Sequence, residues 1–328
     1  MDRKKCSCSH RMVSELPSIV EQGTLMVFNN SRVRKARLFG EAEETGANVE
    51  FLLLNKEKEN GGQGRLWRVM VQRSRRRRPG SRYIFGDANS GDNGKIGAEI
   101  TGADGEYRLL KFDRPIDDAW LDIHGHVPLP PYIRRDDKAE DEERYQTVYA
   151  REYGSAAAPT AGLHFTGELL AKLENAGIET AFITLHVGLG TFLPVRAENV
   201  EDHRMHEESF FIDNETACRI EKAKAEGRKI LAVGTTSART LEAAWIEDRS
   251  LEAKGSLRRG EGSTSIFIYP PYIFKALDAL FTNFHTPEST LLMLVSAFAG
   301  KDFVLSCYKE AVKESYRFYS YGDACLII

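Results

Sequence analysis

The spacing of apolar residues changes along the chain, and this change limits the folds that the chain can adopt. A single short apolar strand is expected at residues 25–28, and it runs into the polar Asn29-Asn30-Ser31. Between about residues 33 and 120, short alternating stretches such as 49–54 and 66–71 are separated by glycine-rich turns. This pattern predicts an antiparallel β domain that forms a small barrel.

From about residue 141 onward, predicted helices and strands alternate. A helix capped by Thr166 is expected to stop at Gly177 before a strand at 181–185. Later units pair helix 215–226 with strand 229–233, which runs through 234–237 into a helix from about Arg239, and strand 279–282 with helix 290–298. Repeated αβ units predict a mainly parallel sheet or a barrel.

Together these patterns predict an α/β fold with a discontinuous main domain. We expect an α/β-barrel-like main domain of residues 1–37 and 125–328, into which an antiparallel β-barrel domain of residues 38–124 is inserted. The length of 328 residues and a hydrophobic content of 42% are sufficient for a substantial core without disulfides.

Charge and cysteine usage exclude some classes of protein. The net charge of −3 means that a nucleic-acid partner would have to bind local basic patches. The five cysteines include no C-x-x-C pair, so neither a disulfide framework nor a zinc ribbon is indicated. No apolar signal core or membrane-spanning run is present, and we therefore expect a cytoplasmic protein.

Polar segments that follow the predicted strands carry the most specific information. They are FNNSRV (28–33), ARLFG (36–40), GHVPLPPYI (125–133), YQTVY (145–149), AAPTAGLHF (157–165), TLHVGLGTF (184–192), EDHRMH (201–206), AVGTTS (232–237), TNFH (282–285) and PEST (287–290). In this order they resemble the motifs of the S-adenosylmethionine:tRNA ribosyltransferase-isomerase family of queuosine biosynthesis. Members of that family usually begin a few tens of residues earlier, so we expect this chain to lack an amino-terminal segment.

The resemblance implies a specific reaction. The family uses S-adenosylmethionine as a ribosyl donor and converts 7-aminomethyl-7-deazaguanine at the tRNA wobble position into epoxyqueuosine, with release of adenine and methionine. It implies S-adenosylmethionine as co-substrate and no metal. The expected partner is the tRNA anticodon stem-loop, and the protein is expected to be a monomer. The implied fold, an α/β barrel with an inserted β-barrel, agrees with the pattern described above.

This chemistry requires a general base to remove the C5′ proton beside the sulfonium. Of the motif histidines, His126 among them, we predict His186, His164 and His285 as catalytic residues, with His186 expected at the carboxyl end of its strand. His203 and His206 are predicted substrate contacts, because their spacing fits no zinc signature.

Further substrate contacts are predicted at other strand ends. Thr235, Thr236 and Ser237, with Arg239, stand between a strand and a helix, where free amides suit a carboxylate or a phosphate; ordinary helix capping is the simpler interpretation. The remaining predicted substrate-binding residues are Asn30, Arg32, Arg34, Asn283 and Glu288.

The strongest basic feature lies in the predicted β domain. Arg75, Arg76, Arg77 and Arg78 stand beside the turn Pro79-Gly80. Such a run is usually a solvated loop, but with tRNA as substrate it predicts phosphate contacts.

Two alternatives from other classes remain open. One is another S-adenosylmethionine-dependent RNA-modifying enzyme, although no G-x-G-x-x-G follows a predicted strand. The other is a non-catalytic or inactive, truncated tRNA-binding homologue, which would bind tRNA without turnover.

Overall fold

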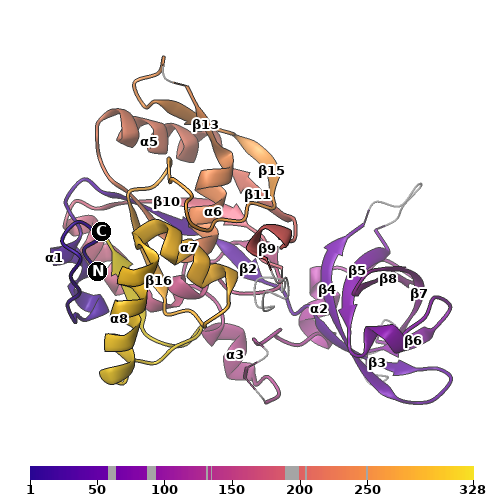
Figure 1. Cartoon of the computed structure of the whole chain (residues 1–328). Helices are drawn as coiled ribbons and strands as arrows, with labels where there is room; N and C mark the ends of the chain where they lie inside the picture. The colour runs from indigo at the N-terminus through magenta and orange to yellow at the C-terminus, as the bar shows by residue number, and fades with distance from the viewer. Residues whose placement is uncertain are drawn as a thin grey trace. The chain divides into compact units, whose positions relative to one another are not determined.

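The structure is a computed structural model, and it forms two compact units. It describes residues 1–57, 64–86, 94–130, 132–133, 135–188, 199–203, 205–248 and 250–328. One unit comprises Met1–Arg32 and Arg144–Ile328, and the other comprises Val33–Glu143 (Figure 1). The first is called the sheet unit below and the second the barrel unit. The domain limits expected at residues 38 and 124 stay a prediction.

The sheet unit is built on a seven-stranded mixed sheet. Its strands pair in the order β15-β11-β10-β1-β12-β16-β17. The four central strands are parallel: β10 (Glu179–Leu185), β1 (Leu25–Asn29), β12 (Ile230–Val233) and β16 (Ala279–Asn283). The outer strands are antiparallel to their neighbours: β11 (Glu208–Ile212), β15 (Gly260–Thr264) and β17 (Ala324–Ile327).

Strand β1 explains why the core lies on both faces of this sheet. All five of its residues are buried, as expected for a central parallel strand covered on both sides. Leu25 and Val27 point into one core cluster, while Met26 and Phe28 point into a second. The alternation follows from the two-residue period of a strand.

Helices cover each face. Buried residues of α5 (Asn214–Ala225), α6 (Gly234–Ala244), α7 (Thr290–Ala299) and α8 (Lys301–Lys313) belong to the first cluster. Buried residues of α1 (Leu16–Ile19), α4 (Gly167–Asn175) and η4 (Thr160–His164) belong to the second. Within the described ranges no single helix is long and apolar enough to cross a membrane; α7 and α8 pass that test only as a pair bent by 113°.

Local capping signals were largely predictive, with one exception. Thr166 accepts a hydrogen bond from the Leu169 amide and begins α4 as expected, and Asp213 and Ser289 cap α5 and α7. The exception is the helix expected from about Arg239. It begins at Gly234, directly after β12, so Thr235 to Ser237 lie in its first turn and not in a connection.

The barrel unit contains a closed antiparallel barrel. Its strands pair in the order β3-β4-β5-β8-β7-β6 around an aromatic core that includes Phe51, Tyr83 and Phe85. The bounds are β3 (Arg37–Ala42), β4 (Asn48–Lys56), β5 (Leu66–Val71), β6 (Arg82–Phe85), β7 (Ile96–Asp104) and β8 (Tyr107–Phe112). Strands β5 and β8 alternate strictly between buried and partly exposed residues, which is the signature of a sheet with one buried face.

Short elements complete the chain. They are η1 (Val13–Glu15), β2 (Ser31–Val33), η2 (Ser74–Arg76), α2 (Asp118–His124), α3 (Ala139–Arg144), β9 (Glu152–Ser155), η6 (Val200–Asp202), β13 (Trp245–Glu247) and β14 (Gly255–Leu257). The predicted α/β class with an inserted antiparallel barrel is therefore confirmed, and the main domain's strands pair as a seven-stranded mixed sheet.

Candidate active site

The four parallel strands bring most of the predicted site residues to one edge of the sheet. Leu25 of β1 lies opposite Glu179 of β10 and Ile230 of β12. In the next pair, Leu231 of β12 lies opposite Ala279 of β16. Their carboxyl ends are therefore aligned. The residues at or just beyond these ends are Asn30 after β1, His186 after β10, Thr235, Thr236 and Ser237 after β12, Asn283 as the last residue of β16, and His285 two residues beyond it.

Asn29 and Asn30 fasten the ends of β1 and β10 together. The fully buried Asn29 amide donates to the Leu185 carbonyl (3.0 Å) and accepts from the Leu185 amide (3.0 Å). The Asn30 side-chain oxygen accepts from the Thr184 hydroxyl at 2.7 Å. These bonds hold the segment that delivers His186.

His186 is held between β9 and β11. Its backbone amide donates to the Ser209 carbonyl at 3.0 Å. A Cβ atom on Gly154 of β9, where φ is +146°, would come within 2.7 Å of the His186 ring, so the bare glycine backbone packs directly on the imidazole. The neighbouring Ser155 hydroxyl accepts from the Val187 amide at 3.0 Å and fixes the same turn.

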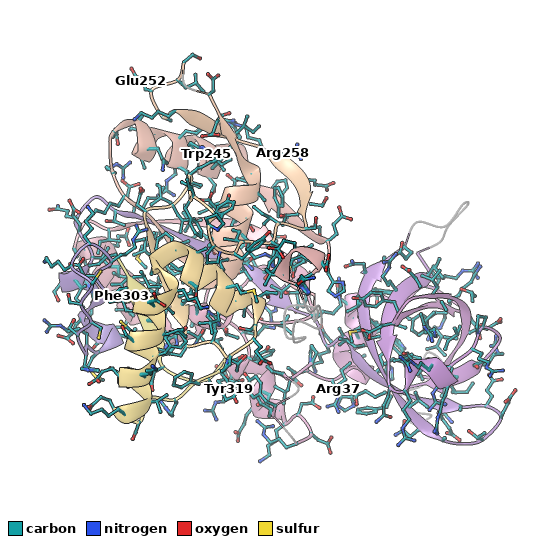
Figure 2. The ribbon with its side chains drawn as sticks, in the orientation of Figure 1. Arg37, Trp245, Glu252, Arg258, Phe303 and Tyr319 are labelled. Carbon is teal, nitrogen blue, oxygen red and sulfur yellow. The ribbon has the colours of Figure 1, made fainter. Side chains whose placement is uncertain are left out.

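A groove of about 620 Å³ opens beside His186. It is lined by Asn30, Glu152, Phe182, Thr184, His186, Ser209, Phe210, Phe211, Asp213, Arg258, Glu261, Gly262 and Ser263. Arg258, which follows β14, is labelled in Figure 2. The lining combines aromatic rings with three carboxylates and one guanidinium, so the groove suits a flat, cationic ligand.

His164 belongs to a hydrogen-bonded group at the end of β16. The Thr160 hydroxyl donates to Asn283 Oδ1 at 3.2 Å, and Asn283 Nδ2 lies 3.1 Å from His164 Nε2. Because the amide nitrogen can only donate, His164 Nε2 accepts and the neutral ring carries its proton on Nδ1. Burial lowers the pKa of His164, and the Asp323 carboxylate opposes that shift.

His285 is more deeply enclosed. Its Nε2 lies 2.9 Å from the Thr282 hydroxyl, and its backbone amide donates to the Tyr308 hydroxyl at 3.3 Å. Burial lowers the pKa of His285 to about 4, so the ring is neutral near pH 7. Strands β10 and β16 are separated by β1 and β12, so His186 and His285 follow strands about 14 Å apart.

Helix α6 presents buried polar groups at the same edge. Arg239 Nη1 donates to Glu208 Oε2 at 2.6 Å, and Glu208 Oε1 accepts from the Gly188 amide at 3.2 Å. The N-cap residue of this helix is Val233, and no side chain of the described residues caps it. Glu208 therefore joins α6 to the turn that follows β10.

Other predicted substrate contacts lie elsewhere. Arg32 of β2 is exposed, with its guanidinium 4.8 Å from the Tyr153 ring centre. Arg34 belongs to the barrel unit and is paired with Asp118. Glu288 is exposed, with φ of +59°, in the turn before α7.

His203 and His206 flank a segment that is only partly described. The ring of His203 packs edge-on against Phe267 at 5.1 Å between centroids, and burial, aided by His206, lowers the pKa of His203. His206 is exposed. The intervening Arg204, and Gly190 of the TLHVGLGTF motif, lie outside the described residues.

The basic run forms an ordered loop on the barrel unit. Arg75 and Arg76 lie in η2, and Arg75, Arg76 and Arg78 are exposed. Arg108 is only 6% exposed and lies beneath this loop. Its guanidinium donates to four backbone carbonyls, those of Ser74, Arg77, Gly105 and Tyr107. A hollow of about 420 Å³ lies beside the loop and is lined partly by Arg73, Arg75 and Arg76.

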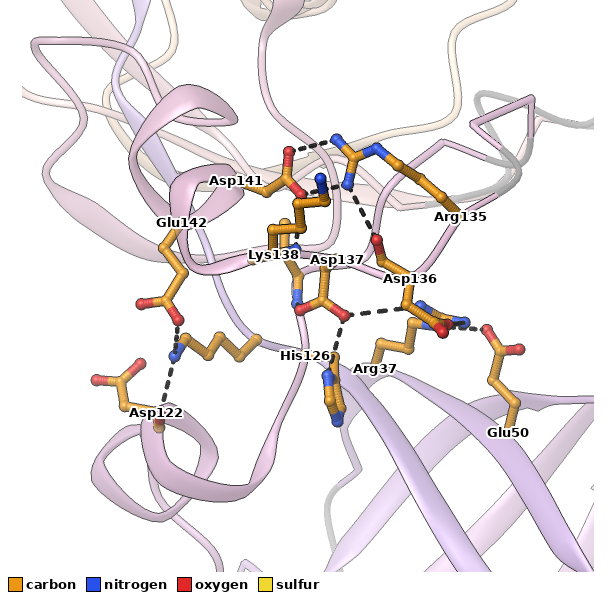
Figure 3. A network of polar contacts seen from close by, with 12 residues as sticks. Arg37, Glu50, Asp122, His126, Arg135, Asp136, Asp137, Lys138, Asp141 and Glu142 are labelled. Atoms are coloured by element: carbon orange, nitrogen blue, oxygen red, sulfur yellow. Dashed lines mark hydrogen bonds and ion pairs between the residues drawn. The ribbon is translucent and has the colours of Figure 1, made fainter.

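His126, a motif histidine, lies in a polar network of the barrel unit (Figure 3). Its Nδ1 lies 2.9 Å from an oxygen of Asp137, whose other oxygen accepts from the Val127 amide at 3.0 Å. Arg37 pairs with Glu50 at 2.7 Å in the same network. Within the described ranges, no group of three or more His, Cys, Asp or Glu side chains is placed to hold a metal ion.

The sequence of the whole chain matches that of one known family. A family model described as "Queuosine biosynthesis protein" matches residues 1–327. The chain belongs to the queuosine biosynthesis protein family. An S-adenosylmethionine:tRNA ribosyltransferase-isomerase of Treponema denticola is 54% identical over 328 residues, covering all of this chain and 91% of the relative. The corresponding Clostridioides difficile protein is 47% identical, with the same coverage.

A solved structure of the same family is also similar. The crystal structure of the S-adenosylmethionine tRNA ribosyltransferase from Thermotoga maritima aligns with a TM-score of 0.51 and 34% identity. It covers 100% of this chain and 90% of that one. The similarity to queuosine biosynthesis proteins predicted from the motifs is therefore confirmed.

Three residues of this queuosine biosynthesis protein were missed by sequence reasoning. Glu208 had a detectable signal, since it occupies an inward position in the alternating strand β11, where a charge requires a partner. Gly154 and Arg108 had none, because packing on His186 and bonding to loop carbonyls both depend on segments distant in sequence.

Proposed function

We propose that the chain is an S-adenosylmethionine:tRNA ribosyltransferase-isomerase. It transfers the ribosyl moiety of S-adenosylmethionine to 7-aminomethyl-7-deazaguanine at the tRNA wobble position and isomerises it, giving epoxyqueuosine and releasing adenine and methionine. Two relatives that carry this name are 54% and 47% identical to the whole chain.

The observation that carries the proposal is the alignment of polar side chains at one sheet edge. Parallel α/β sheets bind their ligands beyond the carboxyl ends of the strands. Here four adjacent parallel strands end in Asn30, His186, the first turn of α6, and Asn283. A protein that only binds tRNA would need a basic surface and not this array.

His186 is the general base that removes the C5′ proton beside the sulfonium. It lines the groove, and Gly154 and β11 restrict its ring and backbone. The carboxylates of Glu152, Asp213 and Glu261 in the same groove favour cationic groups. Both substrates carry a positive group that suits these carboxylates. S-adenosylmethionine carries a sulfonium, and the modified tRNA base carries a protonated aminomethyl group. Phe182 and Phe211 supply rings on which a base can stack.

The second end of the site contains His164, Asn283 and His285. The Nδ1–H of neutral His164 is a hydrogen-bond donor suited to the departing adenine, and Asn283 keeps the ring in that tautomer. His285, with Thr282, holds the turn that carries Asn283. Glu288 contributes a carboxylate from the next turn.

Remaining contacts bind the charged and polar parts of the substrates. Thr235, Thr236, Ser237 and Arg239 receive an anionic group, either a carboxylate or a phosphate. Asn30 contacts the base, while His203 and His206 contact the substrate from their loop. Arg32 and Arg34 contact tRNA phosphates, and Arg34 does so while its guanidinium also pairs with Asp118.

The loop of Arg75, Arg76, Arg77 and Arg78 binds the phosphates of the anticodon stem-loop. Arg108 supports this role, because its bonds to the Ser74 and Arg77 carbonyls hold the backbone of the loop. A pre-ordered cationic loop loses less conformational entropy when it binds. The protein acts as a monomer in the cytoplasm, without a metal ion.

The test is a direct assay of products. The chain is incubated with S-adenosylmethionine and an anticodon stem-loop that carries 7-aminomethyl-7-deazaguanine, and the nucleosides are analysed by mass spectrometry. We expect epoxyqueuosine together with equimolar adenine and methionine. S-adenosylhomocysteine with a methylated nucleoside would support a methyltransferase instead. Salt-dependent binding without any product would support a non-catalytic tRNA-binding protein.

A further inference from the structure

Arg239 has an unused hydrogen-bonding edge although it is almost fully enclosed. Arg239 is 2% exposed, and its Nη1 donates to Glu208. Nε and Nη2 are buried and have no hydrogen-bond partner within the part of the chain that the structure describes. Those two N–H groups lie on one side of the planar guanidinium, where they form the fork that matches a carboxylate.

Two hydroxyls at the start of α6 are also buried without a hydrogen-bond partner among the described residues. Thr236 is 7% exposed and Ser237 is 0% exposed, and among the described residues neither hydroxyl has a partner. Helix side chains lean toward the N-terminus, so Arg239 leans back over this first turn. The backbone amides at the start of the helix, which no side chain of the described residues caps, carry the positive end of the helix dipole.

Buried donors without an acceptor are energetically unfavourable and reduce the stability of the folded protein, and a bound acceptor removes this penalty. Glu208 does not serve the two unused N–H groups, because its oxygens face Arg239 Nη1 and the Gly188 amide. The arrangement therefore favours a ligand that brings its own acceptor oxygens.

The chemistry of the site selects a carboxylate over a phosphate. Only one fork of the guanidinium is unused, and Glu208 already offsets its charge, so a singly charged planar anion fits best. A phosphate of an RNA backbone belongs to a bulky polymer and cannot enter a position where the side chains are more than nine-tenths buried.

We infer that the Arg239 fork, with the hydroxyls of Thr236 and Ser237, binds the carboxylate of the methionine moiety of S-adenosylmethionine. This inference rests on the proposed function and assigns one substrate group to one set of atoms. Arg239 is then a specificity-determining residue that distinguishes S-adenosylmethionine from analogues without the carboxylate. The Gly188 amide bond of Glu208 ties this subsite to the turn that carries His186.

The test compares S-adenosylmethionine with its decarboxylated analogue by calorimetry on the full chain. We expect the wild-type protein to prefer S-adenosylmethionine by about tenfold or more, as for a charge-assisted hydrogen-bonded pair. The double variant Arg239→Met/Glu208→Met removes the pair without leaving a buried charge and should bind both compounds equally. Ser237→Ala should reduce the preference and should not lower the unfolding midpoint, because no hydrogen bond is lost.

Controls separate the possible failures. Arg219→Met removes a partly exposed arginine of the same unit, which pairs with Glu179, and should keep the full preference. Equal binding of both compounds by the wild-type protein, or a preference that survives in the double variant, would overturn the inference while product formation still supports the proposed function. Loss of stem-loop affinity in the double variant with the preference unchanged would overturn it in favour of a phosphate. Failure of the wild-type protein to bind S-adenosylmethionine or form product would overturn both.

Discussion

Gly154 and His186 are in direct contact through a surface that tolerates no side chain. A Cβ at position 154 would lie 2.7 Å from the imidazole, and φ of +146° is a conformation that residues other than glycine rarely adopt. Gly154 lies on β9 and His186 follows β10, so two segments distant in sequence define the orientation of one ring.

The first prediction concerns this contact. Gly154→Ala should displace the His186 ring and reduce kcat on the order of 100-fold, because a displacement of about 1 Å in a reacting group can lower the rate by that much. Gly167→Ala is the matched control, since no heavy atom of the described residues lies within 4 Å of its added Cβ. Steady-state kinetics with the modified stem-loop gives both values. An unchanged kcat in Gly154→Ala, with the variant folded, would mean that the orientation of His186 is irrelevant.

The second prediction concerns pH and stability. The folded-state pKa of His285 is about 4, below its unfolded value of about 6.5, so the unfolded state binds the extra proton between these values. The contribution is fully present above pH 6.5 and is lost as the pH falls toward 4, at about 2 kcal/mol between pH 7 and pH 5. His285→Gln should lack this component in urea unfolding at the two pH values. Equal losses in both proteins would show that His285 titrates normally in the folded state.

The third prediction concerns the basic loop of the barrel unit. Arg75→Gln/Arg76→Gln/Arg78→Gln should weaken stem-loop binding and reduce the slope of log affinity against log salt by about 2 to 3, roughly one for each lost phosphate contact. Lys222→Gln/Lys301→Gln/Lys309→Gln makes the same change in net charge at exposed positions of the sheet unit. Fluorescence anisotropy over a salt series measures both. Equal salt slopes in the two variants would show that the loss of affinity comes from net charge and not from this loop.

A charge-preserving change isolates the order of that loop. Arg108→Lys keeps the positive charge but cannot replace four bonds to the carbonyls of Ser74, Arg77, Gly105 and Tyr107. We expect weaker stem-loop binding than in the wild-type protein, with a similar salt slope. Stem-loop affinity equal to wild type, in a variant whose loop has become sensitive to protease, would show that loop order does not assist binding.

Much of the fold followed from the sequence, for identifiable reasons. The buried run of β1 and the cap at Thr166 are local signals, and both gave elements close to those observed. The arrangement of the strands was harder to predict from the sequence, because αβ units alternate in the same way whether the sheet closes into a barrel or stays open. The start of α6 was misplaced because Thr235, Thr236 and Ser237 are typical of a connection before a helix, whereas they form its first turn.

The positions of the predicted site residues followed only partly from the sequence. Strand-end residues such as Asn30, His186 and Asn283 do reach one edge, because parallel strands align their carboxyl ends. The partners of these residues were not predictable, since pairing between Arg239 and Glu208 depends on how α6 crosses β11. The tautomer of His164 likewise depends on its hydrogen bond with Asn283, 119 residues away, which no local pattern encodes.

The most direct test of the account is adenine release by the wild-type protein and by His186→Gln. Both are supplied with saturating S-adenosylmethionine and modified stem-loop, and the affinity for each substrate is measured alongside. We predict that His186→Gln binds both substrates within about threefold of wild type but releases adenine at least 100-fold more slowly, the upper range for loss of a general base. Adenine release at the wild-type rate by a folded His186→Gln variant would contradict the assignment of the reaction to this groove.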